Sequence, residues 1–156
     1  MKKLMALMMA FVCVLTMTAC GGQEPKAAPF STQILAEIQT AGAFSEELEE
    51  LDADTAFMLY KLADYGLVRE DLTDAAVLRS AGATCEEGAV LIFSDAEKAA
   101  KAAEAMGSYL EGQIEANVDY RPAEIPKLEG AVLKSQAESV LMVVPNDAAA
   151  VRSVLE

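Results

Sequence analysis

Few side chains of this sequence could act in catalysis, and most of the usual combinations of catalytic residues are missing. The chain has 156 residues, no His and no Trp, and a formal net charge of −13. Without an imidazole there is no Ser-His-Asp triad, no Cys-His pair and no histidine-ligated metal. The charge also disfavours nucleic acid, because proteins that bind phosphate backbones carry clustered basic side chains. We therefore expect no nucleic-acid partner, no cofactor and no metal.

Cys85 is the candidate thiol nucleophile of the folded body. It lies in the acidic segment TCEE of residues 84–87. Neighbouring carboxylates raise the pKa of a thiol, whereas a reactive cysteine needs a lowered pKa. No histidine is present to take its proton. The sequence therefore predicts that Cys85 is a plain turn residue without a catalytic role.

Acidic residues are numerous, but none forms a recognisable catalytic or metal-binding motif. Asp52, Asp54 and the acids of residues 46–50 accompany apolar residues, a pattern typical of the solvated face of a helix. None of them matches the calcium loop with its alternating Asp residues and distal Glu. A glycine-rich phosphate loop and the GxSxG serine motif are missing as well. The sequence thus shows no catalytic constellation.

One group combines aromatic side chains with a cation near the end of a predicted helix. Tyr120 and Arg121 precede Pro122, and Tyr109 lies on or near the polar side of the same helix. Such a group could bind a small acidic ligand or a partner protein. The alternative is that Tyr120 packs over the edge of a sheet with its hydroxyl in water. We keep Tyr109, Tyr120 and Arg121 as candidate contacts for a ligand or partner.

The N-terminus has the order of a secretory signal, with charged, apolar and small residues in turn. Two lysines precede an apolar run over residues 4–15, which is shorter than the roughly 20 residues of a spanning helix. Residues 15–20, LTMTAC, resemble the bacterial lipobox, in which the cysteine is lipidated. We expect a lipoprotein signal peptide over residues 1–19 and lipidation at Cys20. The alternative is an ordinary signal peptide in which Cys20 is incidental.

This assignment divides the rest of the chain into a tether and a body. Residues 20–30 comprise the lipidated cysteine and a segment without apolar periodicity, which predicts a flexible tether. Residues 31–156 are predicted to form a single domain. Removing the signal takes away two lysines and no acid, so anionic headgroups repel the body. The lipid, such as palmitate, must therefore supply the membrane affinity. We expect a bacterial, extracytoplasmic protein anchored to the cell membrane.

The apolar pattern of the body predicts an α+β domain with a helical N-terminal third. Helices are expected over residues 31–41, 46–51 and 54–66. Four apolar runs of strand length, predicted to form a mainly antiparallel four-stranded sheet, cover residues 75–80, 89–93, 131–134 and 140–144. The segments VLIFSDAEKAA (90–100) and VLMVVPNDAAA (140–150) are alike. They reflect either a ββα duplication or the generic pattern of a strand and a capped helix.

The clearest predicted element is a long amphipathic helix over residues 96–114 that covers the sheet. Ser94-x-x-Glu97 predicts a capping box at its start. Its sheet-facing stripe is predicted to consist of Ala99, Ala103, Met106 and Leu110. Glu104 is predicted to face water on the opposite side.

Several distributed motifs indicate a family. They are the Tyr65-Gly66 pair, the GATxEE turn of residues 82–87, Asp95 at the start of the alanine-rich helix, Tyr120-x-Pro122 and the strand of residues 140–144. Over roughly residues 55–150, the chain resembles the bacterial lipoproteins built on domain of unknown function 4358. The resemblance implies a lipid-anchored domain on the outer face of the membrane, and it implies no activity.

Two functions of different classes fit these observations. The first is a non-enzymatic, lipid-anchored binding or protein-interaction module at the cell envelope, with a membrane or envelope protein as partner. The second is a carboxylate-dependent envelope hydrolase, whose acids would converge from separate segments. A deep cavity with two close carboxylates would favour the hydrolase, and a flat or apolar exposed patch would favour the module.

Overall fold

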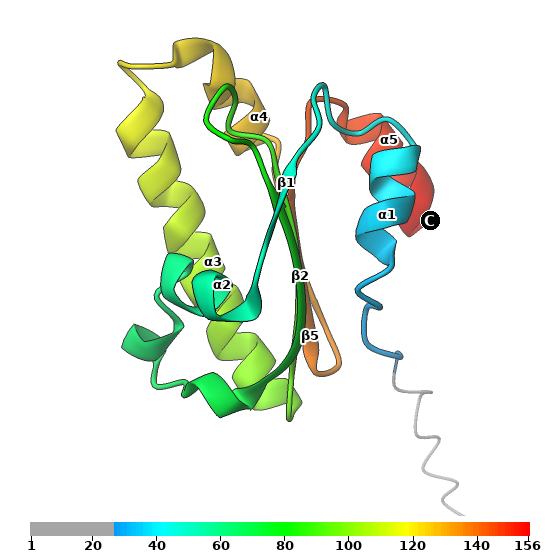
Figure 1. Ribbon diagram of the computed structural model, residues 1–156, viewed down its shortest axis with the longest axis vertical. Helices are drawn as coiled ribbons and strands as arrows, with labels where there is room; N and C mark the ends of the chain where they lie inside the picture. The colour runs from blue at the N-terminus through cyan, green and yellow to red at the C-terminus, as the bar shows by residue number, and fades with distance from the viewer. Residues whose placement is uncertain (1–26) are drawn as a thin grey trace, which may run out of the picture.

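The computed structural model describes residues 27–156, and its centre is an antiparallel sheet of five strands (Figure 1). The strands lie in the order β1-β2-β3-β5-β4, so β3 and β5 are well inside the sheet. Their bounds are Glu49–Leu51 for β1, Leu72–Arg79 for β2, Glu87–Phe93 for β3, Val132–Gln136 for β4 and Ser139–Val144 for β5.

Helices cover both faces of this sheet. α2 and α3 lie on one face, and α1 and α5 lie on the other (Figure 1). The α-helices are α1 (Ile34–Thr40), α2 (Ala53–Leu59), α3 (Ala96–Asn117), α4 (Ile125–Glu129) and α5 (Ala148–Leu155), and the short 3-10 helices are η1 (Leu62–Tyr65), η2 (Arg69–Asp71) and η3 (Pro122–Glu124). The domain therefore has three layers, with one apolar cluster on each side of the sheet.

The central strands are apolar at nearly every position because both of their faces are covered. Leu91 of β3 packs in the cluster beneath α3, and its neighbour Val90 packs in the cluster beneath α1 and α5. Successive residues of a strand point to opposite faces, so a strand covered on both sides has little room for polar residues. Glu87, the first residue of β3, is an exception, since it is charged and only 3% exposed.

The structure confirms an α+β domain with an antiparallel sheet and a long helix packed on it. The predicted count of four strands is wrong, because β1 is a fifth strand within residues 46–51, which the sequence assigned to a helix. In β1, Leu51 pairs with Val77 and Glu49 pairs with Arg79 of β2. An apolar pair and an oppositely charged pair stabilise this short edge strand. The N-terminal third is therefore only partly helical.

α3 begins with a different cap from the predicted one. Asp95, and not Ser94, is the N-cap, and its side chain accepts a hydrogen bond from the Lys98 backbone N–H at 2.9 Å. Ser94 instead accepts a hydrogen bond from the Lys98 ammonium at 2.8 Å, while Glu97 forms an ion pair with Lys101. An Asp carboxylate caps the backbone and also complements the positive end of the helix dipole. The predicted capping box is therefore wrong by one residue.

The sheet-facing side of α3 is also rotated from the prediction. Its buried residues before Tyr109 are Ala99, Ala102, Ala105 and Met106. Ala99 and Met106 are buried as predicted, whereas Ala103 and Leu110 are half-buried and pack against the same cluster. Residues three or four apart share a helix face, so the same face continues to Tyr109 and Gln113. The alanines allow a close approach to the sheet, and the larger residues that follow border a cavity.

The two similar segments, residues 90–100 and 140–150, each form a strand followed by a capped helix. α3 and α5, however, cover opposite faces of the sheet. Val90 packs in the cluster beneath α5, whereas its counterpart Val140 packs in the cluster beneath α3. In each segment the valine therefore lies on the face opposite to the helix that follows it, an arrangement that both a duplication and the generic pattern allow.

The described chain begins against the β4–β5 hairpin. The Phe30 N–H donates a hydrogen bond to Ser139 Oγ at 2.8 Å, and the Ala28 carbonyl accepts one from the Gln136 side chain. The end of the predicted tether over residues 20–30 is therefore attached to the domain.

The predicted signal peptide over residues 1–19 and the predicted lipidation of Cys20 lie outside the described residues. Within residues 27–156, none of the helices has the length and apolarity required to cross a membrane.

Candidate functional site

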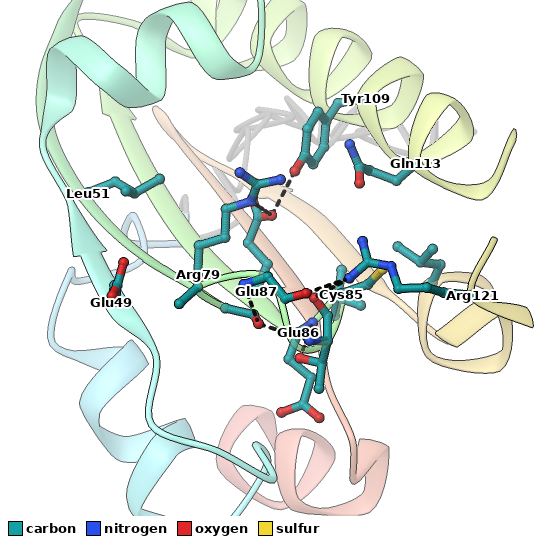
Figure 2. A pocket seen from close by; sticks show the side chains of 15 residues that line it. Glu49, Leu51, Arg79, Cys85, Glu86, Glu87, Tyr109, Gln113 and Arg121 are labelled. Carbon is teal, nitrogen blue, oxygen red and sulfur yellow. Dashed lines mark hydrogen bonds and ion pairs between the residues drawn. The ribbon is translucent and has the colours of Figure 1, made fainter. Parts of the chain in front are cut away.

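A cavity of about 280 Å³ lies at the end of the sheet where β2 turns into β3 (Figure 2). Its walls come from β1, the β2–β3 loop over residues 80–86, the second half of α3 and the segment that follows α3. The charged and polar side chains that line it include Glu49, Arg79, Cys85, Glu86, Glu87, Tyr109, Gln113 and Arg121. These residues are far apart in the sequence and meet because the hairpin tip lies beside α3.

The β2–β3 loop is held in shape by its own hydrogen bonds. Ser80 Oγ accepts hydrogen bonds from the backbone N–H groups of Gly82 and Thr84 at 3.2 and 3.0 Å. Gly82 has a φ of +119°, a conformation that glycine adopts without steric cost. The Cys85 N–H donates to the Glu124 carboxylate at 2.8 Å, which ties the loop to η3. One wall of the cavity is thus fixed by hydrogen bonds between backbone N–H groups and side-chain oxygens.

Arg121 closes the cavity on the side of α3. Its Nη1 donates to the carbonyl oxygens of Gly82 and Thr84 at 3.0 and 3.3 Å, and its Nε donates to Asn117 Oδ1 at 2.8 Å. Asn117 is buried and donates in turn to the Gln113 carbonyl. This chain of contacts directs the guanidinium of Arg121 toward the cavity (Figure 2). Among residues 27–156, its Nη2 group makes no hydrogen bond.

Glu87 provides a buried carboxylate that is enclosed by donors from three elements. The Tyr60 hydroxyl, just after α2, donates to Oε1 at 2.5 Å, and the Tyr109 hydroxyl of α3 donates to Oε2 at 2.7 Å. Arg79 Nε of β2 donates to the same Oε2 at 3.2 Å. The rings of Tyr60 and Tyr109 meet edge to face, with centroids 5.1 Å apart. Both carboxylate oxygens of Glu87 are therefore satisfied.

Burial dominates the titration of this cluster. It raises the pKa of the Glu87 carboxyl, although the hydrogen bonds from the two tyrosines and Arg79 oppose it. Burial also raises the pKa values of Tyr60 and Tyr109, and the charge of Glu87 raises them further. Both tyrosines are therefore held in the neutral, donating form at physiological pH.

Glu86 is fully buried and has different partners from its neighbour Glu87. Its Oε1 accepts hydrogen bonds from the Lys127 ammonium at 2.8 Å and from the Ser45 hydroxyl at 2.5 Å, and its Oε2 accepts one from the Ser45 N–H at 2.7 Å. Burial lowers the pKa of Lys127, but the hydrogen bonds to Glu86 and Glu124 outweigh this effect and raise it. Glu86 therefore fastens the loop before β1 and helix α4 to the start of β3.

Cys85 lines the cavity and is half-buried, and it is the free cysteine of residues 27–156. Burial raises the pKa of its thiol, and the nearby Glu124 raises it further, against the lowering effect of Arg121. A raised pKa disfavours the thiolate, which is the nucleophilic form. The surroundings of Cys85 thus do not activate it.

The structure separates the three residues proposed as ligand or partner contacts. Tyr109 and Arg121 line the same cavity. Tyr120 lies outside it, and its side chain is 82% exposed. The structure therefore brings together two of the three residues and leaves Tyr120 on the surface.

Sequence reasoning missed the other half of the site, namely Arg79, Glu87 and Tyr60. The signal for Glu87 was an acid at the head of an otherwise apolar strand. Its partners lie 8, 22 and 27 residues away along the chain, and no local pattern connects them.

The paired acids considered in the sequence have local roles. Asp52 caps α2 by accepting a hydrogen bond from the Thr55 N–H at 2.8 Å, and this bond lowers the pKa of Asp52. Asp54 forms an ion pair with Arg69 at 2.6 Å. Within residues 27–156, no group of three or more His, Cys, Asp or Glu side chains has an arrangement that could hold a metal ion.

Comparison of the chain with family models, curated proteins and solved structures found no match.

The site itself is best described by the hydrogen-bonding groups that remain unused. Arg79 uses its Nε–H on Glu87 and lies within hydrogen-bonding reach of the Tyr109 hydroxyl, and within residues 27–156 its Nη groups have no other partner. Together with Nη2 of Arg121, they give the cavity guanidinium N–H groups in excess of those that the fold uses, and the Gln113 amide adds a donor and an acceptor. An excess of guanidinium donors suits a ligand rich in acceptors, such as a carboxylate.

Proposed function

We propose that this protein is a lipid-anchored, extracytoplasmic binding module that holds a small acidic ligand between Arg79 and Arg121. The observation that carries the proposal is that two of the four arginines in the sequence line one cavity and have unused N–H groups there. In a chain of net charge −13, such a pair creates a local site for an anion on a body that otherwise repels anions.

The acidic residues of the lining do not cancel this site. Glu86 is paired with Lys127, and Glu87 is paired with Arg79 through the Nε–H alone, which leaves the Nη side of that guanidinium toward the cavity. Glu49 is exposed at the rim. The guanidinium groups of Arg79 and Arg121 therefore remain the cationic donors that the cavity offers to a ligand.

The anchoring part of the proposal rests on the sequence. The charged start, the short apolar run and the Ala19-Cys20 junction support lipidation at Cys20, and the resemblance to the lipoprotein family with domain of unknown function 4358 supports it further. A lipid anchor confines the domain near the membrane, where tethering raises the effective concentration for a membrane or envelope partner. Replacing Cys20 with Ala should abolish lipid labelling and processing, and intact-mass evidence for a different mature start would contradict the anchor.

Ligand binding is tested with butyrate and its neutral counterpart butyramide. The lipidated full chain, held in detergent micelles, is titrated while the NMR signals of the Gly82 and Cys85 amides are followed. We expect butyrate to shift these signals and butyramide to leave them in place. Equal shifts with the two probes would show that the site does not select an acid.

Substitutions of single arginines test whether butyrate binds in this cavity. Arg79→Gln and Arg121→Gln should each weaken butyrate binding about tenfold or more, because each removes a charged donor to the acid. Arg152→Gln is the matched control, since Arg152 lies on α5 and is exposed on the opposite face of the sheet. A similar loss in all three variants would indicate general electrostatics instead of a site.

A carboxylate-dependent hydrolase is the second candidate, and Glu87 favours it because its pKa is raised, as a general acid requires. The reaction would also need a second carboxylate, and the adjacent Glu86 is already bonded to Ser45 and Lys127. The discriminating measurement is hydrolysis of peptidoglycan or glycan substrates by the purified protein. Turnover that disappears in Glu87→Gln while the fold persists would establish the enzyme and overturn the binding module.

A further inference from the structure

A second, larger cavity lies along α3 next to the first. It has a volume of about 650 Å³, and Tyr109 and Gln113 line both cavities. Its other walls are the end of α2, the turn into η1 and the outer side of α3. Because Tyr109 and Gln113 are common to both linings, the two cavities are neighbours along α3.

The chemistry of the second cavity differs from that of the first. Three tyrosines border it, and their hydroxyls are already engaged: Tyr60 and Tyr109 donate to Glu87, and Tyr65 donates to Ser108 Oγ at 2.7 Å. They therefore present mainly the carbon surfaces of their rings. Leu59 and Ala105 add further apolar surface. Lys61, Asp64, Ser108 and Gln113 complete the lining. The second cavity thus offers an apolar bed, bordered by polar side chains, beside the first cavity.

Gly112 keeps this bed open. It lies inside α3, where glycine costs about 1 kcal/mol relative to alanine. No heavy atom lies within 4 Å of the position that its Cβ would occupy, and its backbone has an ordinary helical conformation. Neither packing nor strain therefore requires a glycine there. Gly112 does line the second cavity, where any side chain would project into the space.

We infer that the two cavities form one groove for an amphiphilic acid. The acid group lies between Arg79 and Arg121, and an apolar body extends over Tyr109 toward Leu59 and Tyr65. This inference rests on the proposed function, because it requires the acid group to occupy the first cavity. That cavity alone is small for an organic ligand, whereas binding sites of drug-sized molecules commonly span roughly 300–1,000 Å³. The second cavity supplies the missing volume and the apolar contact.

The test compares butyrate with 4-phenylbutyrate, which has the same acid group and an added apolar ring. The lipidated full chain in micelles should bind 4-phenylbutyrate at least tenfold more tightly, because the ring is buried against apolar surface. Both acids should shift the Gly82 amide signal, and only 4-phenylbutyrate should also shift the signals of Lys61 and Gly112. This measurement needs no variant. 4-Phenylbutyramide, which lacks the charge, should bind much more weakly than the acid.

A pair of variants on the same helix then tests the groove. Gly112→Leu should fill the bed and weaken 4-phenylbutyrate binding at least tenfold while leaving butyrate binding unchanged. Glu111→Leu adds the same side chain at an exposed neighbouring position outside both linings and should change neither. Both variants are compared in the same micelles, so any partition of the ligand into detergent affects them equally.

The outcomes separate the two proposals. If butyrate binds and the phenyl group adds no affinity, the groove is wrong and the acid site stands. If neither acid shifts the Gly82 signal, the proposed acid site itself is wrong. If 4-phenylbutyrate binds as tightly to Gly112→Leu as to the wild type, the apolar body lies elsewhere and the groove is overturned. Equal binding of 4-phenylbutyramide would overturn the role of the acid group.

Discussion

Glu86 and Glu87 are adjacent and almost fully buried, yet their partners differ in kind. Glu86 forms an ion pair with the Lys127 ammonium at 2.8 Å and two hydrogen bonds with Ser45. Glu87 is enclosed by two tyrosine hydroxyls, and its cation, Arg79, lies farther away at 3.2 Å and remains partly exposed. The two carboxylates thus represent two ways of burying a charge.

The difference shows how one residue type can serve two purposes. Glu86 joins three segments of the chain, and the hydrogen bonds that its carboxylate accepts all hold the fold together. Glu87 holds Arg79 by one N–H and leaves the rest of that guanidinium available at the cavity. The first arrangement fixes the walls of the site, and the second orients a group that can bind a ligand.

The largest expected effect is a difference in stability between the same substitution at the two positions. Glu86→Gln leaves the half-buried Lys127 with Glu124 as its remaining countercharge at 3.3 Å. It also removes the charge that accepts from Ser45, and it should cost about 3 kcal/mol in the free energy of unfolding. Glu87→Gln should cost clearly less at pH 7, because burial already raises the pKa of Glu87 and its countercharge, Arg79, remains partly exposed to water. Urea unfolding of both variants measures the difference, and equal losses would remove the distinction between the two carboxylates.

The pH dependence of this difference has a definite sign. The raised pKa of Glu87 means that its contribution to stability is complete below the ordinary carboxyl pKa of about 4.3 and is lost as the pH rises through the folded-state pKa. Glutamine does not titrate. Glu87→Gln should therefore gain stability relative to the wild type as the pH is raised from about 4 to 7, and a constant offset would contradict the raised pKa.

A smaller effect on stability is expected at alkaline pH, and it concerns only the two tyrosines that contact Glu87. The pKa values of Tyr60 and Tyr109 are raised, so unfolding above the ordinary tyrosine pKa of about 10 releases protons. The stability that they contribute is present below that pH and should fall by about 1.4 kcal/mol per tyrosine at pH 11. Tyr109→Phe should reduce the slope of stability against pH, while Tyr120→Phe, at an exposed position, should leave it unchanged. Equal slopes in the two variants would contradict the assignment.

The comparison also shows what the sequence could predict. The long helix and the central strands follow from apolar periodicity, because burial imposes that periodicity directly. β1 could not be recognised, since three residues become a strand only by pairing with β2, more than 20 residues later. Tyr109 and Arg121 were identifiable as unusual residue types, one on the long helix and one in the segment that follows it. Glu87 was not, because its environment consists of side chains from three distant elements.

The smallest effect is expected at Cys85, which precedes the two carboxylates in the same segment. Its backbone N–H is bonded to Glu124, and that contact does not depend on the side chain. Its thiol is half-buried with a raised pKa, and serine is close to it in size. Cys85→Ser should therefore change the free energy of unfolding by less than about 1 kcal/mol and butyrate binding by less than about twofold. A large loss of stability would mean that the thiol packs as core, and rapid alkylation of Cys85 at neutral pH, located by peptide mapping, would show a reactive thiolate despite its surroundings.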